Sequence, residues 1–172
     1  MGKKIGVVMG SDSDLDTMKE ALNTLKEFGL EYDVDVISCH RAPERAFQYA
    51  TEAEKKGYGV IIAGAGGAAH LAGVLASLTT IPIIGVPIMT TGLSGLDSLY
   101  SMVQMPGGVP VATMAIGKAG AKNAGVLAAQ IFSIADPTLR KKLVAYKKKL
   151  SDEVALKSSK IKKEPEPSPR NS

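Results

Sequence analysis

The sequence contains a single cysteine, Cys39, among its 172 residues, and it contains no tryptophan. One thiol excludes an intrachain disulfide and any zinc site built from several cysteines. A membrane helix requires a run of about 18 apolar residues, and no apolar run in the sequence is that long. The residues after Met1 predict a strand and no secretory signal. We therefore expect a cytoplasmic protein without a membrane segment.

Positive charge is also scarce over most of the chain. Residues 1–135 carry ten Lys and Arg against twelve Asp and Glu, a net charge of −2. Residues 136–172 carry eleven against five, a net charge of +6, so the overall charge of +4 belongs to the C-terminal segment. Aromatic residues make up only 5% of the chain and are not interleaved with basic ones as in surfaces that stack bases. We expect no nucleic-acid partner.

Apolar segments of strand length alternate with segments of helical pattern along the chain. This alternation predicts a single α/β domain with a parallel sheet between two layers of helices. The fold class is therefore a three-layer, doubly wound, flavodoxin-like sheet. The third run is apolar on both faces, which predicts a central strand. The predicted strands are residues 3–10, 32–37, 59–63, 83–88 and 111–116. A helix is predicted from Pro43 to about Lys56, after the second strand.

An additional C-terminal helix is predicted after Asp136-Pro137. Its apolar residues form one narrow stripe, which needs a surface to pack against. From Lys157 onward the chain is mainly Lys, Ser, Pro and Glu, a composition that predicts disorder. We expect one domain over residues 1–156 and a disordered tail over 157–172. The stripe consists of Leu139, Leu143, Tyr146, Leu150 and Val154.

Polar side chains follow the first three predicted strands. If these strands are neighbours, their loops converge at the carboxyl edge of the sheet, where ligands of open α/β sheets bind. Residues 11–14 allow two interpretations, a helix N-cap or a cradle for phosphate and sugar hydroxyls. The candidate residues are Ser11 and Asp14 in the first loop, Ser38, His40 and Arg41 in the second, and Gly64 to His70 in the third.

The third loop matches the letters of a dinucleotide-binding fingerprint, Gly64-x-Gly66-x-x-Ala69. That fingerprint also needs an acidic residue at the tip of the next strand, where it binds the ribose. The next predicted strand ends instead in Met89-Thr90-Thr91. We therefore exclude NAD and retain a smaller phosphorylated ligand, which the glycines allow to approach the backbone closely.

The two histidines of the chain, His40 and His70, both lie in these loops. Imidazole can carry protons in both directions near neutral pH. A structural hydrogen bond is the alternative for His40, and a cap of the following helix is the alternative for His70. Arg41 beside Ser38 fits a phosphate clamp, with a surface ion pair to Glu44 as the alternative.

Metal binding and thiol chemistry are both disfavoured by the pattern. No set of His and carboxylate residues stands at metal-ligand spacing. Cys39 directly precedes His40, so the two side chains should point apart, which disfavours a Cys–His nucleophile pair. The residues alone therefore indicate either a proton-transfer enzyme or a binding module for a small phosphorylated ligand.

Five segments carry long motifs: Gly10 to Asp14, Cys39 to Arg45, Gly64 to Leu71, Leu96 to Ser101 and Val103 to Val111. Together they resemble the catalytic-subunit family of phosphoribosylaminoimidazole carboxylase. Within that family they resemble the class I enzymes, the N5-carboxyaminoimidazole ribonucleotide mutases. The similarity extends from about Lys3 to Ile134. The family usually has Ala before its His and Thr before its Pro, where this chain has Cys39 and Ala42.

The resemblance implies an isomerase of de novo purine synthesis that acts without metal, ATP or biotin. It moves carboxylate from the exocyclic N5 to C4 of an aminoimidazole ribonucleotide. The resemblance also implies a homo-octamer. Two alternatives remain: a class II enzyme, which carboxylates aminoimidazole ribonucleotide directly with CO2, and a nucleotide- or flavin-binding module without chemistry. The implied roles are general acid and base for His40, and substrate binding for Ser11, Asp14, Ser38, Arg41, Gly66 and His70.

Overall fold

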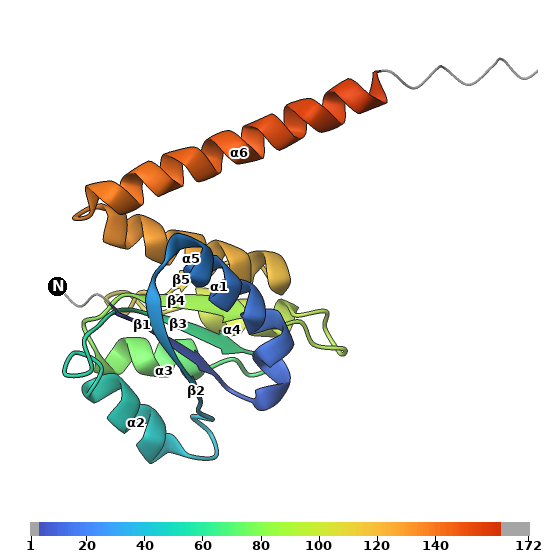
Figure 1. Ribbon diagram of the computed structural model, residues 1–172. Helices are drawn as coiled ribbons and strands as arrows, with labels where there is room; N and C mark the ends of the chain where they lie inside the picture. The colour runs from blue at the N-terminus through green and yellow to red at the C-terminus, as the bar shows by residue number, and fades with distance from the viewer. Residues whose placement is uncertain (1–3, 163–172) are drawn as a thin grey trace, which may run out of the picture.

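The computed structural model describes residues 4–162, and its core is a sheet of five parallel strands. The strands are β1 (Lys4–Met9), β2 (Glu31–Val36), β3 (Tyr58–Ala65), β4 (Ile83–Pro87) and β5 (Ala112–Thr113). Their order across the sheet is β2-β1-β3-β4-β5 (Figure 1). The apolar runs β1, β3 and β4 occupy the centre because both of their faces are covered.

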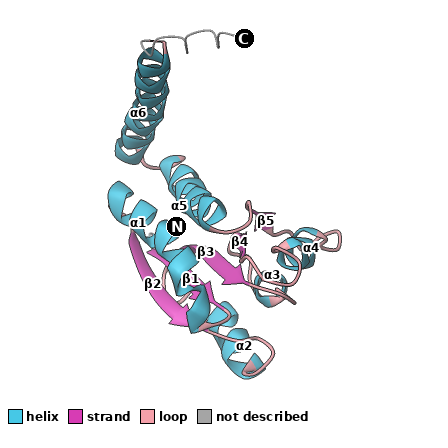
Figure 2. Cartoon of the chain, turned by 90° about the vertical axis from the view of Figure 1, so that its right-hand side faces the viewer, coloured by secondary structure: helices cyan, strands magenta, loops and turns pink. Residues whose placement is uncertain are grey.

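Helices cover both faces of the sheet and complete the three predicted layers (Figure 2). On one face, α1 (Leu15–Phe28) and α5 (Lys118–Ser133) pack in one apolar cluster with the strands. On the other face, α2 (Pro43–Thr51), α3 (Leu71–Leu78) and α4 (Leu96–Val103) contribute to a second cluster. A short 3-10 turn, η1 (Asp12–Asp14), precedes α1. The doubly wound α/β fold is thereby confirmed.

The alanine-rich helix α5 packs within this chain, on β3, β4 and α1. Small residues allow α1 and α5 to lie close together. A Cβ added at Gly125 would lie 2.8 Å from the Cβ of Thr24, whereas non-bonded carbon atoms favour separations of about 3.5 Å or more. Gly125 therefore sets the distance between the two helices.

Two elements are shorter than the sequence pattern predicts. The fifth strand was expected over 111–116, but β5 contains only Ala112 and Thr113. Its partner β4 ends in Pro87, which has no N–H group to continue the ladder. The helix expected over 43–56 ends at Thr51, and turns lead from there to Gly57, whose φ is +78°.

The final helix α6 (Pro137–Ile161) extends five residues beyond the expected end of the domain at 156. Lys and Leu favour helix, and extending an existing helix costs less than starting one, which explains why the helix includes residues 157–161. The remainder of the predicted tail, residues 163–172, lies outside the described residues.

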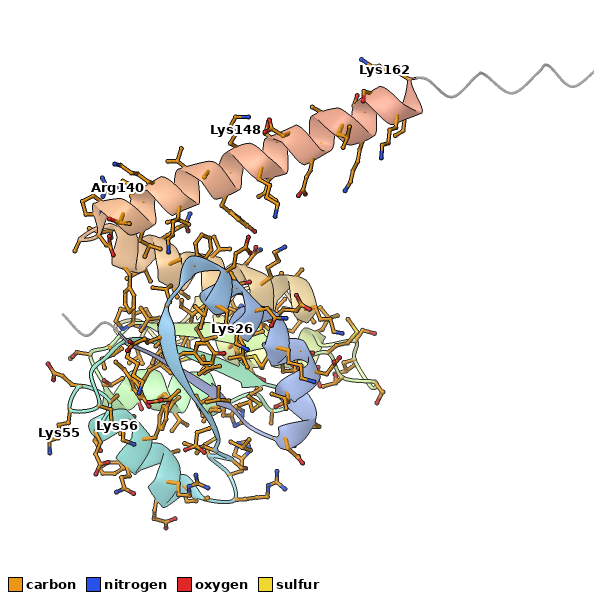
Figure 3. All side chains as sticks on the ribbon, in the orientation of Figure 1. Lys26, Lys55, Lys56, Arg140, Lys148 and Lys162 are labelled. Atoms are coloured by element: carbon orange, nitrogen blue, oxygen red, sulfur yellow. The ribbon has the colours of Figure 1, made fainter. Side chains whose placement is uncertain are left out.

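Only the first part of the α6 stripe packs on the body of the protein. Leu139 and Leu143 are buried, and the Tyr146 ring meets the edge of Phe28 at a centroid distance of 5.4 Å. Beyond Tyr146 the helix projects from the body, as Arg140, Lys148 and Lys162 show along its length in Figure 3. Val154 is 67% exposed there.

No helix in residues 4–162 has the length and apolar character needed to cross a membrane.

One buried polar atom lacks a hydrogen-bond partner among the described residues, the hydroxyl of Tyr49 in α2. It lies against Gly6, at the place where a side chain of residue 6 would begin. Burial raises the pKa of Tyr49 far above its ordinary value. The neighbouring Tyr58, by contrast, donates its hydroxyl to Asp33 at 2.9 Å. The Tyr58 hydroxyl is a polar neighbour of the Tyr49 hydroxyl but makes no hydrogen bond of good geometry with it, so Tyr49 buries a poorly compensated polar group, which lowers stability.

We predict that Tyr49→Phe raises the free energy of unfolding by about 1 kcal/mol, because it removes an unpaired buried hydroxyl. Urea denaturation measures the change. Tyr58→Phe is the matched control and should lower the free energy of unfolding by about 1 kcal/mol, because Asp33 keeps Lys4 but loses the hydrogen bond from Tyr58. A Tyr49→Phe protein that is less stable than the wild type would show that the hydroxyl is satisfied.

Candidate active site

The loops after β1, β2 and β3 meet at the carboxyl edge of the sheet, because β1 lies between the other two strands. The loop after β4 joins them. Together they line a cavity of about 560 Å³. Six of the seven residues predicted from the sequence line this cavity: Ser11, Asp14, Ser38, His40, Arg41 and Gly66. The seventh, His70, does not line it but contacts His40, which does.

The first loop forms a helix cap and lines the cavity at the same time. The Ser11 hydroxyl accepts a hydrogen bond from the Ser13 N–H at 3.4 Å. The Asp14 carboxylate accepts one from the Ser11 N–H at 3.1 Å, which completes a capping box. The cap interpretation of residues 11–14 is thus confirmed, and the same side chains also lie where a ligand would bind.

Asp14 is nearly buried, with 7% of its surface exposed. Burial raises the pKa of its carboxyl group, and the hydrogen bonds from Ser11 and Ser13 oppose this effect without cancelling it. A partly desolvated carboxylate that faces a cavity has acceptor positions for the hydroxyl groups of a ligand.

In the second loop, Ser38 and Arg41 hold each other. The Ser38 hydroxyl accepts hydrogen bonds from the backbone N–H and the Nε of Arg41, each at 3.3 Å. Arg41 forms no ion pair with Glu44 in residues 4–162, whereas the next arginine, Arg45, pairs with Asp35 at 3.1 Å. The Arg41 guanidinium is therefore oriented at the cavity wall with its terminal nitrogens available for an anion.

The two histidines, 30 residues apart in the sequence, are in direct contact. Nε2 of His40 lies 2.9 Å from Nδ1 of His70. The rings are nearly perpendicular, at 88°, with centroids 4.9 Å apart. His70 occupies the N-cap position of α3 but makes no side-chain cap hydrogen bond in the described structure. Its imidazole thus serves His40 and not the helix terminus.

Cys39 packs against the apolar cluster beneath α2 and α3 and also borders the cavity. Burial raises the pKa of its thiol. The thiol therefore stays protonated at neutral pH, which disfavours nucleophilic chemistry by Cys39.

The structure adds residues that the pattern did not predict. Ser13, Met89 and Thr90 line the cavity. Ser98 of α4 bonds to the third loop without touching the cavity. The cap-type composition of residues 11–14 pointed to Ser13. Ser98 lies within the motif from Leu96 to Ser101, but no local signal gives its contacts, because its partners lie 10 and 31 residues away.

Metal ligands are not grouped at this site. Within residues 4–162, no cluster of three or more His, Cys, Asp or Glu side chains is arranged to hold a metal ion. The polar side chains that line the cavity carry hydroxyls, one carboxylate, one guanidinium and the His40 imidazole, which contacts His70. They can bind an anion and hydroxyl groups, and they can move a proton.

Comparisons with known proteins place the chain among purine-pathway enzymes. The sequence model of the AIR carboxylase family matches residues 4–153. The N5-carboxyaminoimidazole ribonucleotide mutase of Thermotoga maritima is 54% identical over 92% of this chain and 91% of its own length. The N5-carboxyaminoimidazole ribonucleotide mutase of Pyrococcus horikoshii is 55% identical over 91% of this chain and 88% of its own length.

A solved structure, PurE of Treponema denticola, superposes with a TM-score of 0.84 at 28% sequence identity. The match covers 93% of this chain and 99% of that chain.

We predict that Asp14→Asn stabilises the protein progressively as the pH rises above 3.8, the ordinary pKa of aspartate. The pKa of Asp14 is raised on folding, so its contribution to stability is present at low pH and is lost as the pH rises through the folded pKa. Asparagine keeps the acceptor for the Ser11 N–H and removes the buried charge. Urea denaturation of both proteins between about pH 4 and 7 measures the difference.

The control for this comparison is Asp16→Asn. Lys118 lowers the pKa of Asp16 through a hydrogen bond, so its contribution has the opposite sign and is lost on acidification. If the stabilities of wild type and Asp14→Asn run parallel over the whole range, burial does not perturb Asp14.

Proposed function

The chain belongs to the AIR carboxylase family, and on this premise we propose that it is an N5-carboxyaminoimidazole ribonucleotide mutase, an isomerase of de novo purine biosynthesis. The observation that carries the proposal is identity above 50% to mutases over about nine tenths of the chain. These relatives favour the mutase over the class II reaction, direct carboxylation with CO2. The paired histidines at the ligand cavity supply the proton carrier that the mutase reaction needs.

The reaction breaks one carbon–nitrogen bond and forms one carbon–carbon bond. In the first half, the carbamate at N5 loses CO2 while the nitrogen gains a proton from His40. In the second half, C4 of the imidazole attacks the retained CO2, and His40 accepts the C4 proton. One imidazole serves both steps because the second restores the proton that the first consumed.

His70 is placed to set the tautomer of His40. In the 2.9 Å contact one ring nitrogen donates and the other accepts, so the proton on one ring depends on the proton on the other. We also propose that His70 contacts the carboxylate of the substrate. This carboxylate lies next to His40 when His40 is within reach of N5 and C4 of the substrate.

The remaining cavity residues divide between the phosphate and the sugar. Arg41 and the hydroxyls of Ser38 and Ser11 bind the phosphate, and Ser38 also holds Arg41 in place. Asp14 accepts hydrogen bonds from the ribose hydroxyls, and the backbone at Gly66 lies against the ring. An anchored ring leaves the reacting atoms in a fixed position relative to His40.

Retention of CO2 requires a wall that excludes water. The apolar side chains that line the cavity supply such a wall, namely Ala65, Ala68, Leu71, Ile88 and Met89. A dry site also prevents capture of CO2 by water before C4 attacks it.

The assembly and location follow from the same proposal. We infer a homo-octamer in the cytoplasm. Exposed apolar side chains around α4 support association, since Met89 and Tyr100 are 64% and 60% exposed. On α6, Val154 and Ile161 continue the apolar stripe beyond the body of the chain. Copies of this chain would bury these surfaces.

We predict that pure protein converts N5-carboxyaminoimidazole ribonucleotide to 4-carboxy-5-aminoimidazole ribonucleotide without added ATP or metal. The assay follows both ribonucleotides by absorbance and chromatography. Aminoimidazole ribonucleotide with bicarbonate serves as the comparison substrate. Efficient turnover of that pair alone would identify a direct carboxylase instead.

We predict that His40→Asn abolishes interconversion, with at least a 100-fold loss of kcat, the typical scale for a general acid–base group. Folding and substrate binding should persist, because asparagine retains a polar side chain of similar reach. Arg41→Ala is the matched comparison, and there we expect mainly a higher KM through the lost phosphate contact. Turnover by His40→Asn at the wild-type rate would remove the proton-transfer role from His40.

A further inference from the structure

A buried hydroxyl joins two walls of the cavity. Ser98 in α4 has no exposed surface. Its hydroxyl accepts a hydrogen bond from the Gly67 N–H at 2.9 Å and donates one to the Ile88 carbonyl at 2.7 Å. Gly67 belongs to the loop after β3 and Ile88 to the loop after β4. A single side chain thus bridges two loops that are separate in the sequence.

Both bridged loops belong to the site. Gly66 and Ala68, on either side of Gly67, line the cavity, and so does Ile88. Gly67 has a φ of +65°, a conformation that the Ser98 hydrogen bond fixes. Three residues further along the same loop is His70, the partner of His40. The Ile88 N–H also donates to the Ala65 carbonyl at 2.9 Å, and Ser101 bonds the Gly67 carbonyl at 3.4 Å. Ser98 adds the side-chain link between Gly67 and Ile88, at the start of the segment that leads to His70.

The preceding residue makes a parallel connection. The Asp97 carboxylate accepts a hydrogen bond from the Thr90 hydroxyl at 2.8 Å, and Thr90 lines the cavity. Two side chains in the first turn of α4, Asp97 and Ser98, thus hold the loop after β4. Of these two, only Ser98 also bonds to the loop after β3.

We propose that Ser98 is a positioning residue that holds these walls together and so retains CO2 between the two halves of the reaction, an inference that rests on the proposed mutase function. Without the hydroxyl, the Gly67 N–H and the Ile88 carbonyl lose their partner in the interior, and water is the replacement. An opened wall releases CO2. The carbamate bond then breaks and the nitrogen takes its proton, but CO2 leaves the site instead of adding to C4.

The test compares Ser98→Ala with the wild type in the conversion of N5-carboxyaminoimidazole ribonucleotide in the presence of 13C-bicarbonate. We expect about a tenfold lower kcat, the scale of one lost buried hydrogen bond. We also expect more free aminoimidazole ribonucleotide per carboxylated product, after subtraction of decomposition in buffer. More 13C should enter the product carboxylate, because CO2 from solution replaces the CO2 that has escaped.

Ser133→Ala is the matched control. Ser133 is also a buried helical serine, but its hydroxyl bonds only the Gln130 carbonyl of its own helix, and it does not line the cavity. Turnover and product ratio should remain as in the wild type. Ser98→Cys keeps the volume of the side chain and a weak donor, so it should give an intermediate ratio, and it carries the test if Ser98→Ala does not fold.

The product ratio separates positioning from folding. A variant that is merely less folded makes less free aminoimidazole ribonucleotide and less carboxylated product. The ratio of the two, and the 13C content of the product carboxylate, then stay as in the wild type. That outcome for Ser98→Ala, or unchanged turnover, would overturn the inference. Failure of the wild type to interconvert the two carboxylated ribonucleotides would instead overturn the proposed function.

Discussion

The position of β1 between β2 and β3 is the constraint on which the rest of the structure depends. All five strands are parallel, so their carboxyl ends lie along one edge of the sheet. A central β1 places the loops that begin at Gly10, Ser38 and Gly66 around a single cavity. The rigid sheet thus brings together side chains from distant parts of the sequence.

His40 lines that cavity and contacts His70, so the pair offers imidazole groups that can carry a proton. The 2.9 Å separation is that of a hydrogen bond in which one ring nitrogen donates and the other accepts. The surroundings suit this task. Burial keeps the Cys39 thiol protonated, and apolar side chains from the loops after β3 and β4 line the cavity beside the polar groups.

Much of this arrangement was predictable because it depends on local pattern. The runs that form β1, β3 and β4 are apolar throughout, and the loops after parallel strands must share an edge. The short β5 was not predictable from its own residues, since Pro87 on the neighbouring strand limits the ladder. The extension of α6 to Ile161 reflects helix propagation into residues whose composition resembles a tail.

The contacts between side chains could not be predicted from the sequence. No spacing rule states that two imidazoles 30 residues apart touch, or that Ser98 reaches Gly67. The alternatives left open for His70 were decided by an orientation that only the folded chain defines. Local pattern indicated proton transfer on a phosphorylated ligand. The reaction itself came from the similarity of long motifs, which the family membership then supported.

The central claim is that His40 exchanges its proton with the reacting atoms of the imidazole. A crystal structure with the carboxylated product ribonucleotide bound tests it most directly. The account predicts that C4 or the exocyclic nitrogen lies within about 3.5 Å of a His40 ring nitrogen, with the phosphate on Arg41 and Ser38. A ring bound beyond about 6 Å from both histidines, with its phosphate elsewhere, would contradict it.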